Sequence, residues 1–481
     1  MLGLAAAGDD AGTNSPPGPN RSFPFAPMFH WARFLRDPIR FMTEARSRYG
    51  DIVDLSGLGA RRVIVFKDEY LEQILNDPAR FRNIDVSSCP LRLPAETPLR
   101  NLFSGLTFMN GEEHRAHRRV IAPVFDSHRT AQFSSHTSDV TRGAMADLAG
   151  RQTVDIYLWA RRVTFEIATR LVLGSAMALD SRHLQRLMDA WLGAVFSLSS
   201  VVFPFDVPGT QYHRLLRLSA ALEREIVAAF GAPRDGADDA GGFLDLIENP
   251  KGGATRPLSR NAAVGHVNLL LLAGHMTTAC ALCWTLFLLA QHPRVYAAVL
   301  GEIDSLDADR TSQVGQLNSL KLLHNVILES LRLCPPILWW SRTCTAATRL
   351  GSYDIEAGTQ IIFSAFMTHR DPHVFKHPNR FLPDRWDTEH PTPFQFIAFS
   401  AGPRKCIGSN LALLELKVML VELLRDHWFS LPPDAKIDYS GFMLCAPKGG
   451  MALIPNPRST PLYRNTVTGS VNRLVELDGA A

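Results

Sequence analysis

Cys406 is the residue of this chain best suited to metal chemistry, because it lies in the glycine-punctuated stretch Phe399–Gly408, directly before a long apolar-periodic run. Leucines recur behind it at spacings of three and four, which predicts a helix from Cys406 to about Trp428. Unpaired N–H groups at a helix start, together with the basic neighbours Arg404 and Lys405, favour a thiolate over a thiol. The sequence therefore points to Cys406 as a metal-ligating thiolate.

A lone intracellular cysteine is more often a small buried hydrophobe, so the residues around Cys406 decide between the two interpretations. Gly402 and Gly408 permit the positive φ angles and the close backbone approach that a flat cofactor needs. The stretch resembles the haem-binding signature FxxGxRxCxG of the cytochrome P-450 family at five specified positions, namely Phe399, Gly402, Arg404, Cys406 and Gly408. The resemblance implies that Cys406 is the axial ligand of a haem b iron and that the other four residues bind the cofactor.

His114 and Arg118 form a second candidate constellation, in a helix that opens at Asn110–Arg119. Their spacing of four residues puts them on one helix face. Taken alone, such a pair is more often a solvated basic face. The family resemblance implies instead that both residues, together with Arg342, hold the haem propionates through charge-assisted hydrogen bonds.

The segment Asn261–Pro293 contains no charged residue and is long enough to span a membrane. Because its centre, Ala273–Thr278, is polar and no second apolar span is present, we predict that it is the buried central helix of a large protein. In the family, this helix crosses above the haem with a small-Gly-x-acid-Thr-Thr pattern. The matching residues, expected to be catalytic, are Ala273, Gly274, Thr277 and Thr278. Met276 stands where the family has its acid, which puts the usual proton delivery in doubt.

Glu329 and Arg332 lie three residues apart in a helix predicted over Leu320–Leu333, ahead of two prolines. Ion pairs at this spacing are common and contribute little when exposed. The resemblance implies a buried triad with Arg385, which would fix geometry rather than add stability. The following residues should line the substrate pocket with Met276: Ile337, Leu338, Trp339 and Trp340.

Composition limits the class of protein. The chain has 481 residues, 46% hydrophobic and 20% charged, which is ordinary for a globular protein. A net charge of +3 indicates no particular partner, and nothing suggests nucleic-acid binding. The seven cysteines form no pairwise framework, and Cys280 with Cys283 lies in an apolar run rather than in a zinc site, so we expect a reducing, cytoplasmic location.

The chain is predicted to form one catalytic domain over 26–456, preceded by a flexible proline-rich leader over 1–25 without a membrane anchor and followed by a polar tail over 457–481. Smaller predictions are a helix from Pro38 to Gly50, a hairpin over 51–66, a long loop over 83–105, mostly helices over 140–230 and a surface linker over 231–242. Phe196, Phe203 and Phe205 would usually be core. The resemblance suggests lid helices over a substrate channel instead.

The resemblance covers roughly Phe25 to Pro455 and implies the mainly α cytochrome P-450 fold with a small β-region, in a soluble, bacterial-type monomer. The expected activity is a monooxygenase of secondary metabolism that uses O2 and two electrons from a ferredoxin or flavodoxin-type donor. Its substrate would be an apolar or aromatic small molecule. A haem-thiolate enzyme with another outcome, such as desaturation, cyclisation, coupling or peroxide-driven oxidation, stays open because of Met276. A non-catalytic haem sensor is disfavoured by Thr277, since a sensor needs no proton relay.

Overall fold

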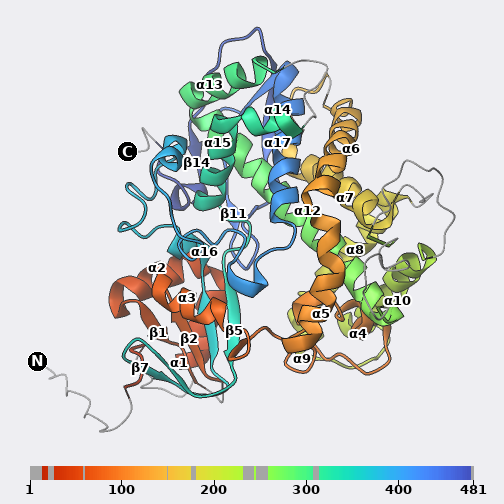
Figure 1. Ribbon diagram of the computed structural model, residues 1–481, viewed down its shortest axis with the longest axis vertical. Helices are drawn as coiled ribbons and strands as arrows, with labels where there is room; N and C mark the ends of the chain where they lie inside the picture. The colour runs from red at the N-terminus through yellow and green to blue at the C-terminus, as the bar shows by residue number, and fades with distance from the viewer. Residues whose placement is uncertain are drawn as a thin grey trace, which may run out of the picture.

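The computed structural model describes residues 14–19, 26–57, 60–148, 150–174, 180–230, 243–244, 258–306 and 314–477. A large helical body adjoins a smaller region built on a β-sheet, as predicted for the fold class (Figure 1). The predicted linker over 231–242 and most of the predicted leader lie outside the described residues.

Helices form most of the described chain. The α-helices are α1 (Ala26–Arg36), α2 (Pro38–Tyr49), α3 (Asp68–Asn76), α4 (Pro98–Leu102), α5 (Gly111–Ile121), α6 (Ser127–Met145), α7 (Ile156–Leu173), α8 (Ser181–Val195), α9 (Leu198–Val202), α10 (Gln211–Ala228), α12 (Arg260–Gln291), α13 (Pro293–Asp304), α14 (Val314–Ser319), α15 (Lys321–Leu333), α16 (Ala365–Thr368) and α17 (Ser409–Asp426). The 3-10 helices are η1 (Leu106–Phe108), η2 (Ala122–Phe125), η4 (Pro383–Asp387), η5 (Gly402–Arg404) and η6 (Ser470–Arg473).

The strands are short and form several small sheets. They are β1 (Ile52–Asp54), β2 (Arg62–Val65), β3 (Phe81–Arg82), β4 (Val154–Asp155), β5 (Trp340–Cys344), β6 (Thr348–Leu350), β7 (Tyr353–Ile355), β8 (Gln360–Phe363), β9 (His427–Ser430), β10 (Ala435–Lys436), β11 (Tyr439–Ser440), β12 (Ala446–Pro447), β13 (Ala452–Pro457) and β14 (Val467–Thr468). The largest sheet has the order β1-β2-β8-β5-β3, and it includes the predicted hairpin, whose strands β1 and β2 pair antiparallel. β5 pairs with β8 in the register Arg342↔Ile361, which fixes Arg342 within this sheet.

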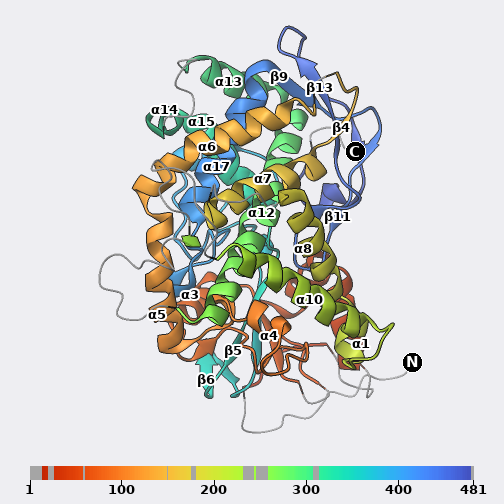
Figure 2. The same ribbon diagram turned by 90° about the vertical axis from the view of Figure 1, so that its right-hand side faces the viewer.

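The central helix α12 packs along α7 through the middle of the helical body (Figures 1 and 2). A Cβ added at Gly274 would lie 3.2 Å from the Cβ of Ala168 on α7, so the glycine lets the two helices approach closely. In the described chain, α12 is the helix long and apolar enough to cross a membrane, with mean hydropathy 1.6 and 61% of that window buried inside the protein. Most of its residues from Ala262 to Gln291 pack in the core, in agreement with the predicted central helix.

Local capping explains where several helices begin. α2 starts as predicted, because the Asp37 side chain accepts a hydrogen bond from the N–H of Arg40 and Pro38 occupies the first turn. The same signal at Thr97 and Pro98 starts α4, whose Thr97 hydroxyl accepts from the N–H of Arg100. The predicted long loop over 83–105 is therefore present over most of its length but contains the short helix α4.

The two ends of the chain are tied to the body wherever the structure describes them. In the predicted leader, the carbonyls of Asn14 and Pro17 accept hydrogen bonds from the N–H groups of Asp354 and Asp54. In the predicted polar tail, the apolar side chains Val471, Leu474, Val475 and Leu477 are buried in the main hydrophobic cluster. Residues 457–477 are thus continuous with the domain, because their apolar side chains complete its core.

Candidate functional site

Cys406 lies in the loop between η5 and α17, with its side chain exposed. Its N–H donates to the carbonyl of Phe399 at 2.8 Å, which closes the loop across the glycine-rich stretch. α17 begins at Ser409, behind the cap residue Gly408, and ends at Asp426. The predicted helix is therefore present, but it starts three residues after Cys406, because the cysteine belongs to the closed loop.

The electrostatic environment of the Cys406 thiol combines opposing effects. Burial of the group among protein atoms raises its pKa, although the residue as a whole is exposed. The Gly408 N–H, Arg118 and Lys405 each lower that pKa, in the direction expected from the sequence. Burial is the largest effect, so the pKa of the thiol is raised overall even though the loop N–H group and Lys405 favour the thiolate as predicted.

Four basic side chains from three parts of the fold gather near this loop. His114 is buried on α5, and burial together with Arg404, Arg118 and other cations lowers its pKa to about 4. Burial and the neighbouring Arg404 lower the pKa of Arg342 to about 10, and burial and Arg118 lower that of Arg404 to about 10. The structure thus brings together the residues that the sequence assigned to the propionates.

The hydrogen bonds of this basic cluster go to neutral groups. Arg404 donates to the carbonyls of Leu106 and Met109 and to Asn110 Oδ1, at 2.9 Å for the last contact. Arg118 Nη2 donates to the Lys405 carbonyl at 2.9 Å. Arg342 Nη1 donates to the Ser341 carbonyl at 2.9 Å.

No carboxylate pairs with Arg118, Arg342 or Arg404 in the part of the chain that the structure describes. Clustered cations without anions lower one another's pKa, and two carboxylates placed among them would relieve that repulsion. No group of three or more candidate metal ligands exists among the described residues, so a metal here would depend on one sulfur and a ligand of its own. The donor set therefore fits an iron porphyrin with two propionates.

The two glycines of the loop differ in conformation, and only Gly402 has the positive φ that the sequence predicted. Gly402 has φ +66°, and a Cβ added there would lie 2.3 Å from the carbonyl oxygen of Leu75 on α3. Gly408 has an ordinary φ of −93°, and its added Cβ would contact the Phe125 ring at 3.4 Å. Both glycines thus let the loop pack closely against α3 and η2, and the close approach of a flat cofactor stays a prediction.

The centre of α12 is partly accessible in a mostly buried helix, and Leu269, Ala273, Met276 and Thr277 form an accessible stripe there, while Leu270, Leu272 and Gly274 are also partly exposed. Ala273 is exposed, while Leu269, Met276 and Thr277 are partly exposed, at the spacing of a single helix face. Thr277 Oγ1 donates to the Ala273 carbonyl at 2.9 Å, and Thr278 Oγ1, which is buried, donates to the Gly274 carbonyl at 3.0 Å. Ala273, Met276 and Thr277 thus face open space, whereas Gly274 packs toward α7.

His275 is excluded as a replacement for the missing acid. Its ring is fully buried against Phe165 of α7, at 5.0 Å between ring centroids. Its Nδ1 lies 2.6 Å from the Leu271 carbonyl. The side chain therefore points away from the accessible stripe.

The segment 337–340 lines open space only in part. Leu338 is fully buried, and Trp339 is buried between Phe34 and Phe442, with its Nε1 donating to the Phe442 carbonyl. Ile337 and Trp340 remain partly exposed. The prediction that Leu338 and Trp339 line a pocket was wrong, because both side chains are committed to the core cluster.

The aromatic residues of the proposed lid are on the surface. Phe196, Phe203 and Phe205 are 63%, 61% and 58% exposed, beside α9 and the connection that follows it. An exposure this high excludes the usual core role. It is consistent with a segment that covers an opening.

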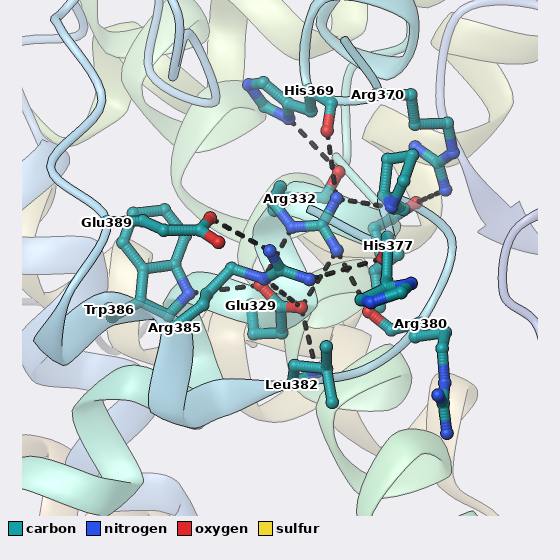
Figure 3. A network of polar contacts seen from close by, with 12 residues as sticks. Glu329, Arg332, His369, Arg370, His377, Arg380, Leu382, Arg385, Trp386 and Glu389 are labelled. Atoms are coloured by element: carbon teal, nitrogen blue, oxygen red, sulfur yellow. Dashed lines mark hydrogen bonds and ion pairs between the residues drawn. The ribbon is translucent and has the colours of Figure 1, made fainter. Parts of the chain in front are cut away.

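Glu329, Arg332 and Arg385 form the predicted triad, and all three are buried (Figure 3). Arg332 Nε and Nη2 donate to the two carboxylate oxygens of Glu329 at 2.8 and 2.9 Å, and Arg385 Nε donates to Glu329 Oε1 at 3.1 Å. Trp386 Nε1 and the N–H of Leu382 also donate hydrogen bonds to the Glu329 carboxylate.

His369 is the structural residue that the sequence analysis missed. It is fully buried, and the Arg332 side chain donates to its carbonyl at 2.9 Å (Figure 3). In the sequence His369-Arg370-Asp371-Pro372, no helical or strand spacing relates His369 to another candidate residue. The only signal was the polar run itself, which directly follows the mostly apolar stretch 361–367.

Comparisons with known proteins extend over most of the chain. The family model for cytochrome P-450 matches residues 16–454. The chain is 29% identical over 410 residues to a cyclooctat-9-en-7-ol 5-monooxygenase of Streptomyces melanosporofaciens, covering 83% of this chain and 86% of that protein. It is 26% identical over 428 residues to a protopanaxadiol 6-hydroxylase of Panax ginseng, covering 88% of each. Its fold is similar to that of a retinoic acid-bound cyanobacterial CYP120A1, with TM-score 0.79 and 22% identity over 93% of this chain and 100% of that one.

Proposed function

The chain belongs to the cytochrome P-450 family and is a haem-dependent monooxygenase, and we propose that its haem-binding centre is the loop of Cys406. The observation that carries this proposal is the exposed Cys406 thiol beside a basic cluster without carboxylate partners. Cys406 would supply the axial sulfur to a haem b. Arg118, Arg342, Arg404 and His114 would hold its propionates through charge-assisted hydrogen bonds.

When bound, the haem supplies the activation of dioxygen with two electrons from a redox partner. The residues of α12 would control protons and water near that chemistry. Since the Thr277 hydroxyl hydrogen is donated to the Ala273 carbonyl, its oxygen lone pairs remain free to accept a hydrogen bond from water. Thr277 would thus hold a water in place on the accessible stripe.

Met276 has a thioether side chain, which cannot pass a proton on. The proton that the family takes from an acid at this position would reach Thr277 Oγ1 through ordered water or a hydroxyl of the substrate. His275 is buried on the α7 side and does not contribute.

The substrate would be an apolar or aromatic small molecule with few polar groups. The accessible stripe of α12 and the partly exposed Ile337 and Trp340 offer apolar contact surface, as ligand pockets generally do. Two of the relatives are named for monooxygenation or hydroxylation at one numbered carbon, which supports a similar oxygen insertion in secondary metabolism.

A second outcome is favoured by Met276 alone. Peroxide-driven oxidation would place less demand on proton delivery, because hydrogen peroxide brings its own protons. Desaturation, cyclisation or coupling with O2 would need the same protons as hydroxylation and would differ in the fate of the substrate. The two outcomes differ in whether one atom of O2 enters the product.

The electron donor would be a ferredoxin or flavodoxin-type protein, and the enzyme would act as a cytoplasmic monomer. Lys405 is exposed within the loop of Cys406, the partly exposed Arg118 donates to its carbonyl, and the next residue of α5, Arg119, is exposed. These cations would attract an acidic partner surface.

A screen of apolar compounds for a change in the optical spectrum of the haem tests the function. A compound that shifts the spectrum should be converted, with donor and ¹⁸O2 present, to a product one labelled oxygen heavier. Conversion without label in the product would favour the second outcome. No conversion by any compound that binds would contradict a catalytic role.

A further inference from the structure

His369 joins two segments that are distant in the sequence. Its Nδ1 lies 3.1 Å from the carbonyl oxygen of Arg332 in α15. Its Nε2 accepts a hydrogen bond at 2.9 Å from the N–H of Ile397, which precedes the loop of Cys406. The ring is fully buried and stacks on Phe396, with 4.9 Å between centroids and 26° between planes.

The two contacts fix the protonation of the ring. A backbone N–H can only donate, so Nε2 must carry a lone pair, and a carbonyl can only accept, so Nδ1 must carry the hydrogen. His369 is therefore a neutral imidazole with one defined tautomer. Each of its polar atoms has a partner, and loss of the ring would leave a buried N–H and a buried C=O unpaired.

The link to Arg332 runs in both directions. The His369 side chain donates to the Arg332 carbonyl, while Arg332 Nη1 donates to the His369 carbonyl at 2.9 Å (Figure 3). Arg332 is also held by both carboxylate oxygens of Glu329. The position of the imidazole is consequently set by the triad.

The link to Ile397 continues into the loop. The Ile397 carbonyl accepts from the N–H of Ser400 at 2.9 Å, and the Phe399 carbonyl accepts from the N–H of Cys406 at 2.8 Å. Ser400 has φ +57°, a left-handed conformation that a non-glycine residue keeps only where its surroundings enforce it. Ile397 is fully buried and thus provides a fixed point from which this turn begins.

We propose that His369 is a positioning residue, which transmits the geometry of the Glu329–Arg332–Arg385 triad to the loop of Cys406 through the N–H of Ile397. The proposal rests on Cys406 being the haem ligand. On this proposal, His369 fixes the position of the loop, and the position of the loop sets the orientation of the Cys406 sulfur toward the iron.

Two substitutions separate the two hydrogen bonds. His369→Gln places an amide oxygen near the position of Nε2 and keeps an acceptor for Ile397. His369→Asn places an amide N–H near the position of Nδ1 and keeps the donor to Arg332, but it leaves Ile397 unpaired. Phe396→Leu is the matched control, because it removes the stacked ring and neither hydrogen bond.

The readout is the fraction of reduced, carbon monoxide-bound holoenzyme that shows the red-shifted Soret band of thiolate-ligated haem. We expect His369→Gln and Phe396→Leu to keep this fraction within about twofold of the unsubstituted enzyme, and His369→Asn to lower it severalfold and raise the reduction potential. The same loss in the His369→Gln and His369→Asn variants, or none in either, would overturn the proposal. Absence of the band in the unsubstituted holoenzyme would instead contradict the assignment of Cys406.

Hydrogen exchange of the unsubstituted holoenzyme gives a test that needs no variant. The Ile397 amide should exchange as slowly as the core amides of α15. Rapid exchange at Ile397, with α15 protected, would show that the hydrogen bond to His369 does not hold the loop.

Discussion

At the scale of single residues, Cys406 and the cations around it depend on one another. Burial disfavours the charged form of the thiol, and it equally disfavours the uncompensated charges of Arg342 and Arg404. A ligand that accepts the thiolate and carries carboxylates relieves both penalties together. Without a ligand, the charges of these residues are unfavourable. An iron porphyrin with two carboxylates would make the same charges favourable.

Cys406→Ser should abolish the red-shifted Soret band of the reduced, carbon monoxide-bound protein, since a serine hydroxyl does not replace a thiolate ligand. The measurement is an optical difference spectrum of protein reconstituted with haem. Cys89→Ser, at a partly buried cysteine of the 83–105 segment, is a matched control that should leave the band intact. A Cys406→Ser variant that keeps the band would show that the iron has another ligand.

Thr277→Ala should divert most electrons into hydrogen peroxide, because general acid–base assistance is typically worth about a hundredfold or more. Product and peroxide are measured together with the native substrate. Thr285→Ala is the control, since Thr285 lies on the same helix, is buried and donates to the Ala281 carbonyl in the same way. Full coupling in Thr277→Ala would favour chemistry that bypasses standard oxygen insertion.

The triad and the basic cluster were predicted from the family resemblance, because the spacing of charged residues alone favoured an exposed ion pair and a solvated basic face. The resemblance was not sufficient for Leu338 or Trp339, whose apolar side chains suit a pocket and a core equally well. His369 was missed for another reason. Its role depends on hydrogen bonds to two backbone groups. Every residue has such groups, so the sequence does not show which of them a side chain will contact.

At the scale of elements, the long apolar run of α12 was predictable because a chain segment without charge has to be buried. The accessible stripe within it was not, since it depends on which neighbours cover each face. The loop of Cys406 shows the same limit. Its glycines indicate an unusual backbone, but whether they approach a cofactor or α3 depends on the packing.

Gly402→Ala tests the packing of that loop on α3. The alanine would have a positive φ and a Cβ 2.3 Å from the Leu75 carbonyl, so we expect a loss of at least ~3 kcal/mol in the free energy of unfolding and weaker haem retention. Gly358→Ala is the matched control, because Gly358 has φ +80° with no atom within 4 Å of an added Cβ. Its cost should be ~1 kcal/mol, from backbone strain alone. Equal costs in chemical denaturation would show that α3 yields to the added methyl group.

At the scale of the whole molecule, a net charge of +3 gives no indication of a partner, whereas the placement of individual cations does. Lys405→Glu should slow reduction by an acidic ferredoxin about tenfold at low ionic strength, with the difference fading as salt rises. Stopped-flow reduction across a salt series measures this. Arg142→Glu, at an exposed site near the end of α6, should have little effect. Rates independent of salt in the unsubstituted enzyme would contradict docking beside Cys406.

Stability against acid also belongs to the whole molecule, because its buried histidines lie both in α12, at His266 and His275, and beside α15, at His369. Burial lowers the pKa of His266 and His369 to about 3 and that of His275 to about 4. Each histidine takes up a proton in the unfolded chain below its ordinary value of 6.5, but stays neutral when folded. The stability that they contribute is therefore complete above about pH 6.5 and is lost as the pH falls toward about 4, at ~1.4 kcal/mol per pH unit for each histidine.

Glu415 opposes this trend. Burial in α17 raises its pKa to about 8, so its folded form binds a proton more tightly than the unfolded chain does. Its contribution is complete below about pH 4.5 and is lost as the pH rises to about 8. Between about pH 6.5 and 4.5 it offsets one histidine, which leaves a net slope of ~3 kcal/mol per pH unit from these four groups.

His275→Leu should reduce the number of protons taken up on unfolding by one, and with it the dependence of the free energy of unfolding on pH. The substitution removes a hydrogen bond to the Leu271 carbonyl but also a buried Nε2 that has no partner, so the folded state near pH 7 should change little. Urea unfolding at about pH 6.5 and 5.5 measures the effect: the variant should lose ~1 kcal/mol less than the unsubstituted enzyme over that interval, because the unfolded histidine is already half protonated at about pH 6.5. An identical loss in both proteins would mean that His275 is already protonated in the fold, or exposed to water by local opening of α7 from α12.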